Sequence, residues 1–179
     1  MKPSYSAAFL ALLGTGLLTQ CEKSSDRAAT TKAPSTVAAV AKTAPAAVKS
    51  DLPLKKIEVT ANDQMKFSVT QLEAGPGQPL EVTFRNAGTM PKASMGHNWV
   101  LLIKGADPDK LAENAFTAAG NDYIPPDMED QVITRTKILG PGESETLTFN
   151  APSEPGDYVF YCSFPGHLGI GMKGLLTIK

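Results

Sequence analysis

Short apolar runs separated by turn residues dominate the chain from Leu54 onward. The runs are rich in Val, Ile, Thr and Phe, several of them alternate apolar with polar residues, and Gly or Pro stands between them, which is typical of strands in an all-β protein. The expected strands lie near residues 57–59, 65–69, 80–84, 99–103, 132–138, 147–149, 157–162 and 174–178. About eight half-apolar strands bury their apolar faces most simply between two sheets, so we predict a Greek-key β-sandwich.

Three local features refine this prediction. Residues 132–138 and 147–149 flank Pro141-Gly142 and are expected to pair as a hairpin, while the continuous apolar run 99–103 predicts a strand buried on both faces. Asp107-Pro108 is typical of a helix N-cap followed by proline in the first turn, and apolar residues then recur at helical spacing before Gly120. We therefore predict one short helix insertion over 108–119, followed by an irregular loop at 123–126.

The first 52 residues are not expected to belong to the sandwich. An apolar run from Ala7 to Leu18 is too short to span a bilayer and has the length of a signal-peptide core. Cys21 follows it, which resembles a bacterial lipoprotein signal, although Gln20 stands where a small residue is usual. We predict a lipoprotein-type signal peptide at 1–20, a disordered linker of Ala, Ser, Thr, Lys and Pro at 21–52, and a folded domain at 53–179.

Charge and cysteine content limit the possible partners and the cellular compartment of the protein. The chain has 17 basic and 18 acidic residues, and a net charge of −1 argues against nucleic acid as a partner. We predict an exported, periplasmic protein tethered to a membrane by a lipid on Cys21. Cys162 would then be a lone thiol in an oxidising compartment, where a bound metal protects it from oxidation. A disulfide between Cys21 and Cys162 is the alternative.

Both histidines of the chain and one of its two cysteines fall within two short motifs. The first is Met95-Gly96-His97-Asn98-Trp99, and the second runs from Cys162-Ser-Phe-Pro-Gly-His167 to Met172. One thiolate, two imidazoles and a weak thioether form the ligand set of a mononuclear blue copper site. The sequence therefore predicts one type 1 copper per chain, cycling between Cu(I) and Cu(II).

Each residue of these motifs has an expected role at the metal. Cys162 would supply the thiolate, His97 and His167 the imidazoles, and Met172 the axial thioether. Gly96 has no side chain, so its carbonyl is able to approach the ion from the face opposite Met172. Further hydrogen bonds are expected from Asn98 to Ser163 and from backbone amides near Phe164 to the Cys162 sulfur.

The two motifs resemble those of the azurins and the auracyanins. Further matches to azurin occur at Asn62-Asp-Gln-Met65, Asn121-Asp-Tyr123 and Thr136-Lys-Ile-Leu-Gly140, and the resemblance covers about residues 55–179. It implies a cupredoxin fold and one-electron transfer outside the cytoplasm. It also implies that the copper ligands are the Gly96 carbonyl, His97, Cys162, His167 and Met172.

The chain departs from azurins at two points. Four residues separate His167 from Met172 where azurins usually have three, a spacing closer to that of auracyanin and plastocyanin. The predicted domain also lacks the cysteines for the disulfide that azurins usually carry.

In azurin-like proteins, redox partners dock transiently at an apolar patch, which here would surround His167 and consist of Met90, Met95, Phe164, Leu168 and Ile170.

Three functions use these residues to different extents. A one-electron carrier without enzymatic activity uses the whole ligand set. A copper delivery or storage protein is the alternative, although such proteins usually present exposed, exchangeable Met or His clusters, which the predicted linker lacks. A hydrolase with Cys162 as nucleophile and His97 or His167 as base leaves Met172 unused and has no evident residue to orient the base.

Overall fold

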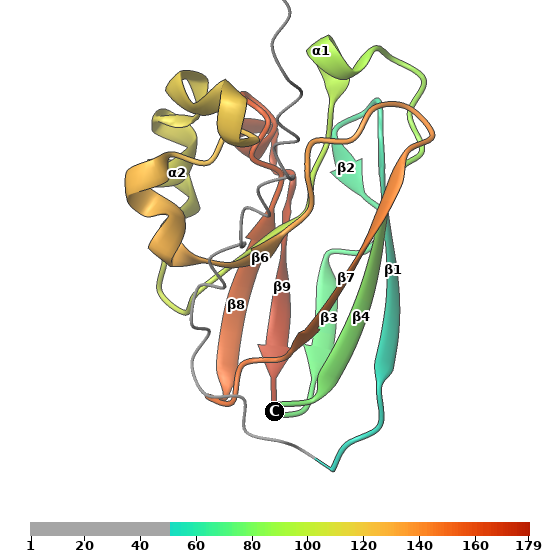
Figure 1. Cartoon of the computed structure of the whole chain (residues 1–179), viewed down its shortest axis with the longest axis vertical. Coiled ribbons are helices and arrows are strands. Elements are labelled where there is room, and N and C mark those ends of the chain that lie inside the picture. Colours follow the sequence, from blue (N-terminus) through green and yellow to red (C-terminus); the bar gives the residue numbers. More distant parts are fainter. Residues whose placement is uncertain (1–50) are drawn as a thin grey trace, which may run out of the picture. The chain divides into compact units, whose positions relative to one another are not determined.

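The computed structural model describes residues 51–179, and in this part of the chain nine strands form two β-sheets (Figure 1). One sheet has the order β2-β1-β4-β7, comprising β2 (Lys66–Phe67), β1 (Lys55–Asn62), β4 (Pro79–Asn86) and β7 (Ser144–Asn150). The other has the order β3-β9-β8-β5-β6, comprising β3 (Gln71–Ala74), β9 (Lys173–Ile178), β8 (Gly156–Tyr161), β5 (Val100–Leu102) and β6 (Val132–Arg135). The predicted signal peptide and nearly all of the predicted linker lie outside the described residues.

The chain passes repeatedly from one sheet to the other, which confirms the predicted Greek-key sandwich. β1 pairs in parallel with β4 and β3 in parallel with β9, whereas the remaining pairs are antiparallel. Strand β4 shows why the sheets face each other, because Leu80, Val82 and Phe84 point inward with at most 1% exposure while the residues between them are half-buried. This alternation is the pattern of a strand with one face in the core.

Aromatic side chains fill the space between the sheets. Trp99, Phe160 and Phe84 are fully buried, and the Trp99 and Phe160 ring centroids lie 5.4 Å apart. Phe67 contacts Phe84 and Phe160 edge-on, at centroid distances of 6.1 and 5.5 Å. Such contacts add to the stabilisation from burial alone.

A second apolar cluster covers the outer face of the five-stranded sheet. Val100, Leu102 and Tyr161 reach it from β5 and β8, and they pack with Leu111 and Ile124 of the segment between β5 and β6. Leu101 of β5 belongs instead to the core between the sheets. The prediction of burial on both faces is therefore confirmed for Val100–Leu102, but the strand is shorter than the predicted 99–103 and Ile103 is 42% exposed.

The segment between β5 and β6 contains the predicted helix, but in a shorter form. The α-helix α2 (Pro108–Glu113) begins as expected, with the Asp107 carboxylate accepting a hydrogen bond from the Asp109 amide at 3.0 Å. It ends six residues before the predicted 119, and two 3₁₀ helices follow at Ala115–Asn121 and Pro126–Gln131. Asn114 caps α2 by donating its backbone amide to the Ala112 carbonyl, and the non-helical backbone of Ala118 interrupts the 3₁₀ helix that follows, so the apolar spacing does not continue as one helix.

Two further short helices flank the loops at one end of the sandwich, and the sequence did not predict either of them. They are α1 (Lys92–Met95) and a 3₁₀ turn at Leu168–Ile170. None of the helices among residues 51–179 has the length and apolar character needed to cross a bilayer.

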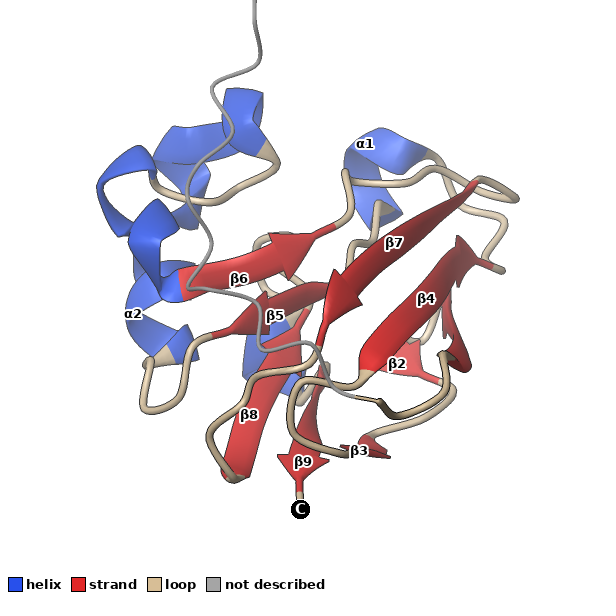
Figure 2. Cartoon of the chain, turned by 60° about the horizontal axis from the view of Figure 1, so that its bottom comes forward, coloured by secondary structure: helices blue, strands red, loops and turns tan. Residues whose placement is uncertain are grey.

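The predicted hairpin of residues 132–138 with 147–149 is wrong. β6 pairs with β5 and β7 pairs with β4, so the two strands lie in different sheets (Figure 2). The expected strand over 65–69 also shrinks to the two residues of β2, because Met65 has a left-handed backbone with φ 56°. Strand β3, which follows β2 in the chain but lies in the other sheet, was not predicted. Its buried residues are Leu72 and Ala74.

Candidate metal centre

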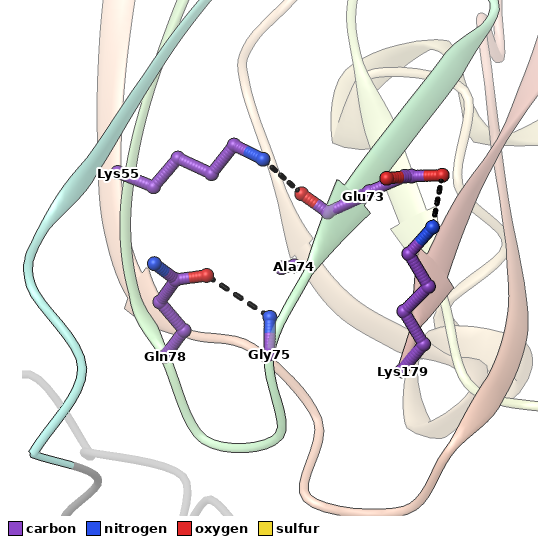
Figure 3. Close-up of a pocket in the computed structure, with 6 residues that line it drawn as sticks. All are labelled: Lys55, Glu73, Ala74, Gly75, Gln78 and Lys179. Carbon is purple, nitrogen blue, oxygen red and sulfur yellow. Dashed lines mark hydrogen bonds and ion pairs between the residues drawn. The ribbon is translucent and has the colours of Figure 1, made fainter.

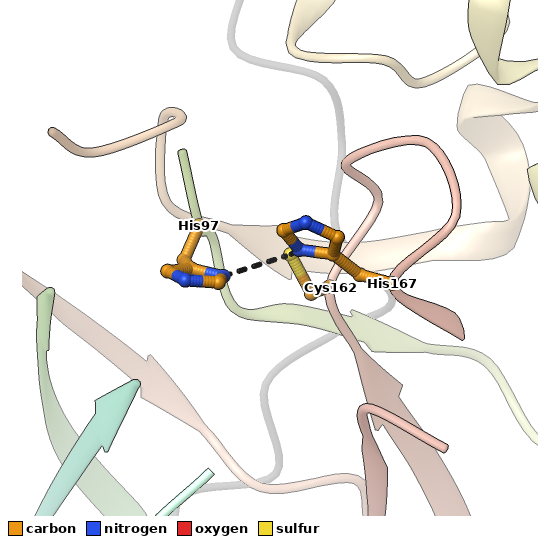
Figure 4. A group of neighbouring side chains, drawn as sticks. All are labelled: His97, Cys162 and His167. Atoms are coloured by element: carbon orange, nitrogen blue, oxygen red, sulfur yellow. Dashed lines mark hydrogen bonds between the residues drawn. The ribbon is translucent and has the colours of Figure 1, made fainter. Parts of the chain in front are cut away.

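Two segments, one before β5 and the other the loop between β8 and β9, bring the side chains of His97, Cys162 and His167 together (Figure 4). His97 lies between α1 and β5, and a two-way backbone bridge with Leu139 holds it, with N···O distances of 3.1 and 2.7 Å. Cys162 directly follows β8, and His167 lies in the loop that leads into β9. Strands from one sheet and a crossing segment therefore fix the positions of the three side chains.

The three side chains present their ligand atoms to one point. The Cys162 Sγ lies 3.5 Å from Nδ1 of His167 and 3.9 Å from Nδ1 of His97. All three ligand atoms lie within 4.8 Å of one another, and the side chains are at most 2% exposed. Among residues 51–179 this is the one group of three or more His, Cys, Asp or Glu side chains arranged to hold a metal ion.

The loop from Cys162 to Met172 is closed by its own backbone. The His167 amide donates to the Phe164 carbonyl at 3.1 Å, the Met172 amide donates to the His167 carbonyl at 3.1 Å, and the Cys162 amide donates to the Met172 carbonyl at 3.2 Å. The four residues between His167 and Met172 form a 3₁₀ turn that ends at Gly171 in a left-handed conformation, φ 90°. The longer spacing is thus taken up by a regular turn, and Met172 remains buried in the same cluster as Cys162.

Asn98 and Ser163 join the two ligand motifs, as predicted. The Asn98 side-chain amide donates to the Ser163 hydroxyl at 2.8 Å, and the Ser163 amide donates to the Asn98 side-chain carbonyl at 2.9 Å. Both residues are buried, so these bonds do not compete with water. The neighbours of His97 and Cys162 are therefore held at a fixed separation.

Burial shifts the pKa of each candidate ligand toward its neutral form. Desolvation raises the pKa of the Cys162 thiol to about 12, against a smaller opposing effect of hydrogen bonds from the Asn98 and Phe164 amides. Desolvation, with a smaller contribution from the charge of His97, lowers the pKa of His167 to about 4. The pKa of His97 is also lowered by desolvation, although the Asn62 carbonyl and the Asp63 carboxylate oppose this shift. The metal-free site therefore holds a neutral thiol and two neutral imidazoles.

These residues fit a copper ion chemically. Neutral imidazoles and a thiol that ionises on metal binding are the donors that soft and borderline metals prefer, and no carboxylate, which would favour harder ions, joins the group. His97 and His167 both present Nδ1 to the Cys162 sulfur. These nitrogens are thus the ones aimed at the common point.

Gly96, the remaining expected ligand, lies in close contact with its surroundings. A Cβ atom placed on it would lie 2.5 Å from Cγ2 of Ile138 and 2.6 Å from the Lys92 carbonyl. Only glycine therefore allows the chain to pass from α1 into the His97 position at this distance.

The residues expected in the apolar patch differ in exposure. Ile170 is 56% exposed and Met90 41%, while Met95 and Phe164 are half-buried. Leu168 does not belong to an exposed patch, because it is 6% exposed and packs in the second apolar cluster with Leu111 and Tyr161. The amphipathic character of a 3₁₀ turn, with one face inward, accounts for the difference between Leu168 and Ile170.

Residues that the sequence did not assign to the site also contact it. The Asp122 carbonyl accepts a hydrogen bond from the Ser163 hydroxyl at 2.6 Å, and the Tyr123 ring packs edge-on against Phe164 at 5.1 Å. Phe164 in turn packs against the His167 ring at 4.7 Å. The match of Asn121-Asp-Tyr123 to azurin was the only sequence signal that pointed to this turn.

A shallow hollow of about 230 Å³ lies at the far end of the sandwich, where β1 and β4 begin and β3 and β9 end (Figure 3). Its charged groups bond to one another: Lys55 donates to the Glu73 carbonyl, and Lys179 pairs with the Glu73 carboxylate, both at 2.6 Å. The hollow therefore has no part in the metal centre.

Comparison with known proteins gives the same result as the geometry. Residues 54–179 match the family described as copper binding proteins, plastocyanin/azurin family. Outer membrane protein H.8 of Neisseria gonorrhoeae is 39% identical over 122 residues, which are 67% of this chain and 65% of that protein, so the chain spans slightly less than two thirds of that relative. Azurin of Pseudomonas fluorescens biotype C is 35% identical over 127 residues, covering 69% of this chain and 98% of the azurin.

Solved structures resemble the described domain over nearly their whole length. Auracyanin of Roseiflexus castenholzii superposes with a TM-score of 0.62 at 38% identity, covering 70% of this chain and 97% of the auracyanin. An azurin of Methylomonas sp. strain J superposes with a TM-score of 0.61 at 34% identity, covering 70% and 98%. The cluster of His97, Cys162 and His167 is thus able to hold a copper ion, the metal that the matched family binds.

Proposed function

The chain belongs to the plastocyanin/azurin family of copper-binding proteins and has the cupredoxin fold, and from this we propose that it is a one-electron carrier that acts outside the cytoplasm. The observation that carries the proposal is the convergence of the Cys162 sulfur and two imidazole nitrogens on one buried point. A bound copper ion would supply the one-electron redox chemistry. The protein contributes a ligand set held by two segments of the sandwich that are bonded to each other, so little rearranges when the charge of the site changes.

The proposed ligand set has five members. Cys162, His97 and His167 are the strong ligands, and Met172 is the weak axial one, which its burial beside Cys162 supports. The Gly96 carbonyl is proposed on the opposite face, supported by the close contacts that exclude any side chain there.

Copper delivery or storage is a weaker alternative. A protein that hands over copper benefits from ligands that are accessible to the recipient, and here the three converging side chains are at most 2% exposed. A Cys-His hydrolase is weaker still, because nucleophilic attack needs a thiolate, and the pKa of the buried Cys162 thiol is raised to about 12.

Loading the full chain with copper(II) tests the carrier function. We expect an intense blue colour from charge transfer between the thiolate and copper, and reversible one-electron reduction. Cys162→Ser should abolish the colour, while Cys21→Ser, which changes the other cysteine of the chain, should retain it. A colourless copper complex of the unsubstituted protein would contradict the carrier function, and rapid transfer of copper to a weak chelator would favour delivery.

We further propose that the protein is exported to the periplasm and tethered to a membrane through a lipid on Cys21. The signal-like run before Cys21 and the similarity to an outer membrane protein support this location. Labelling cells with a radioactive fatty acid should mark the full chain but not Cys21→Ala. Equal labelling of both would exclude Cys21 as the anchor.

Redox proteins are the proposed partners, docking transiently at a patch of Met90, Met95, Phe164 and Ile170 around the His167 loop. The exposure of Met90 and Ile170 supports this surface. Ile170→Asp should slow electron exchange with a redox partner without changing the colour of the site, because Ile170 lies outside the buried ligand group. An unchanged exchange rate would argue against the patch.

A further inference from the structure

The turn at Asn121–Tyr123 contacts the Cys162 motif directly and is linked to the His97 motif through Ile138 and Leu139. The Asp122 carbonyl accepts the hydroxyl hydrogen bond of Ser163, the residue after Cys162, at 2.6 Å. One carboxylate oxygen of Asp122 accepts a hydrogen bond from the Ile138 amide at 2.9 Å. Ile138 precedes Leu139, whose backbone bridges to His97. A single residue, Asp122, therefore contacts the neighbours of two ligand segments.

This turn has an unfavourable backbone conformation, which local bonds to the Ala118 carbonyl and side-chain contacts from other segments hold in place. Asp122 and Tyr123 are consecutive non-glycine residues with left-handed backbones, φ 52° and 62°. Such conformations cost free energy and persist only where the surrounding contacts determine them. Arg135, at the end of β6, makes more hydrogen bonds to this turn than any other single residue.

The Arg135 guanidinium makes four hydrogen bonds, three of them to the turn. Its Nη1 donates to the Asn121 carbonyl at 3.0 Å and to the second carboxylate oxygen of Asp122 at 3.3 Å. Its Nη2 donates to the Asn121 side-chain carbonyl and to the Glu129 carboxylate, both at 3.0 Å. The Arg135 side chain is 23% exposed and that of Asp122 30%, so the pair is partly shielded from water. A planar guanidinium is suited to fixing several acceptors at once, which a lysine ammonium does less well.

We propose that Arg135, acting through Asp122, is a positioning residue for the copper loop. The pair holds the turn in its left-handed form, and the turn then fixes Ser163 through its hydroxyl and Phe164 through the Tyr123 ring. These two residues follow Cys162 directly, and Phe164 packs on the His167 ring. The inference rests on the proposed copper site, but it concerns residues that do not touch the metal.

The test compares copper(II) binding and spectra of the full chain with those of Arg135 variants. Arg135→Ala should remain able to bind copper but with an affinity lower by about tenfold, the size of effect usual for residues that orient metal ligands. Its charge-transfer absorption and its electron paramagnetic resonance pattern should change, because the thiolate and the His167 ring are held less firmly. Arg135→Lys should restore part of both properties.

Two further variants separate positioning from a general loss of stability. Asp122→Asn retains an acceptor for the Ile138 amide and tolerates the left-handed backbone, but it loses the ion pair, so it should shift the spectrum in the same direction as Arg135→Ala. Lys104→Ala removes a comparable ion pair, Lys104 with Glu154 at 2.6 Å, near the start of β8 at the opposite end of that strand from Cys162. Its spectrum and copper affinity should match those of the unsubstituted protein.

A double variant tests whether Arg135 acts through the Ser163 hydroxyl. The losses of copper affinity in Arg135→Ala and Ser163→Ala should combine to less than their product, because both changes release the same link. Strictly multiplicative losses would overturn the proposal. So would an Arg135→Ala protein that melts at a lower temperature but keeps the spectrum and the affinity of the unsubstituted chain. If the unsubstituted chain itself gives no blue complex, the proposed function fails instead.

Discussion

Asn98 and Ser163 hold each other by two hydrogen bonds of 2.8 and 2.9 Å, in which each residue both donates and accepts. Each stands directly after a candidate copper ligand, Asn98 after His97 and Ser163 after Cys162. The pair therefore joins two segments that are distant in the sequence and holds them at a fixed separation. It fixes the separation of the segments that carry the imidazole and the sulfur before a metal binds.

Removing the two hydrogen bonds between Asn98 and Ser163 should weaken both the fold and the metal site. Asn98→Ala leaves the buried Ser163 amide without a partner, which costs about 1–3 kcal/mol of unfolding free energy. Copper affinity should fall by about tenfold. Denaturant unfolding of the metal-free protein and competition with a chelator measure the two effects.

A matched control lies on the other sheet. Thr83→Ala removes the cross-strand hydroxyl bond to Thr146, 3.0 Å long, on the β4–β7 pair. It should lower the unfolding free energy by about 1 kcal/mol or less and leave the copper affinity unchanged. If Asn98→Ala also left copper affinity unchanged, the pair would serve the fold alone.

Copper binding at neutral pH should release one proton. The pKa of the Cys162 thiol is raised to about 12 by burial, so the metal must displace its proton, whereas the pKa of His167 is lowered to about 4, so this ring has none to lose. The apparent affinity should then rise about tenfold per pH unit between pH 7 and 9. Calorimetry in two buffers with different ionisation enthalpies counts the protons. Binding without proton release would mean that the thiolate exists before the metal arrives.

The metal-free protein should lose stability on mild acidification. Burial depresses the pKa of His167 from 6.5 to about 4 in the folded state and also lowers that of His97. Between pH 6.5 and 5 the unfolded chain therefore takes up protons that the folded chain refuses, so stability is lost as the pH falls. Going from pH 7 to pH 5 should cost about 1–2 kcal/mol for His167. His167→Gln should flatten the profile of unfolding free energy against pH, and a flat profile in the unsubstituted protein would contradict the burial effect.

The ligand trio was predictable from the sequence because its residue types are rare in this chain and each has a specific chemistry. The sandwich was predictable because alternation within a strand is a local property, and the five-residue apolar run gave the burial of β5 on both faces. Pro141-Gly142 suggested a hairpin, but a turn does not specify which strands it joins. Pairing of β6 with β5 and of β7 with β4 depends on contacts between residues far apart in the chain.

Other features depend on packing that leaves no local pattern. Leu168 and Ile170 are similar in sequence, and only the direction of a 3₁₀ turn decides that the first is buried and the second exposed. In the sequence, Arg135 is indistinguishable from other polar strand residues. Only the fold places it beside Asp122, which is 13 positions away in the chain. No pattern in the residues around Asp122 predicts its left-handed backbone conformation.

The axial position can be tested by a substitution that conserves volume. Met172→Leu should cost less than about 1.5 kcal/mol of unfolding free energy, because Met172 is buried in the apolar cluster and leucine fills a similar space. The axial ligand and the hydrophobicity around the thiolate tune the potential of such a site. Leucine offers the more highly charged Cu(II) no axial donor, so Met172→Leu should raise the reduction potential while the blue colour persists. Cyclic voltammetry measures the shift. Met128→Leu, in the second cluster, should leave the potential unchanged, and an equal shift in both variants would remove Met172 from the ligand set.

The close packing around Gly96 gives a final test. Its backbone angles, φ −68° and ψ 148°, suit any residue, so Gly96→Ala carries no conformational cost. The added Cβ would instead lie 2.6 Å from the Lys92 carbonyl and 2.5 Å from Ile138, next to the residue that bridges to His97. Relieving these contacts must move His97 or α1, so we expect a loss of about 1–3 kcal/mol in unfolding free energy and a changed copper spectrum.

Gly120→Ala, where no atom lies within 4 Å of the new Cβ, should be neutral in both measurements. If Gly96→Ala kept the spectrum of the unsubstituted protein, neither its carbonyl nor its contacts would be setting the copper geometry.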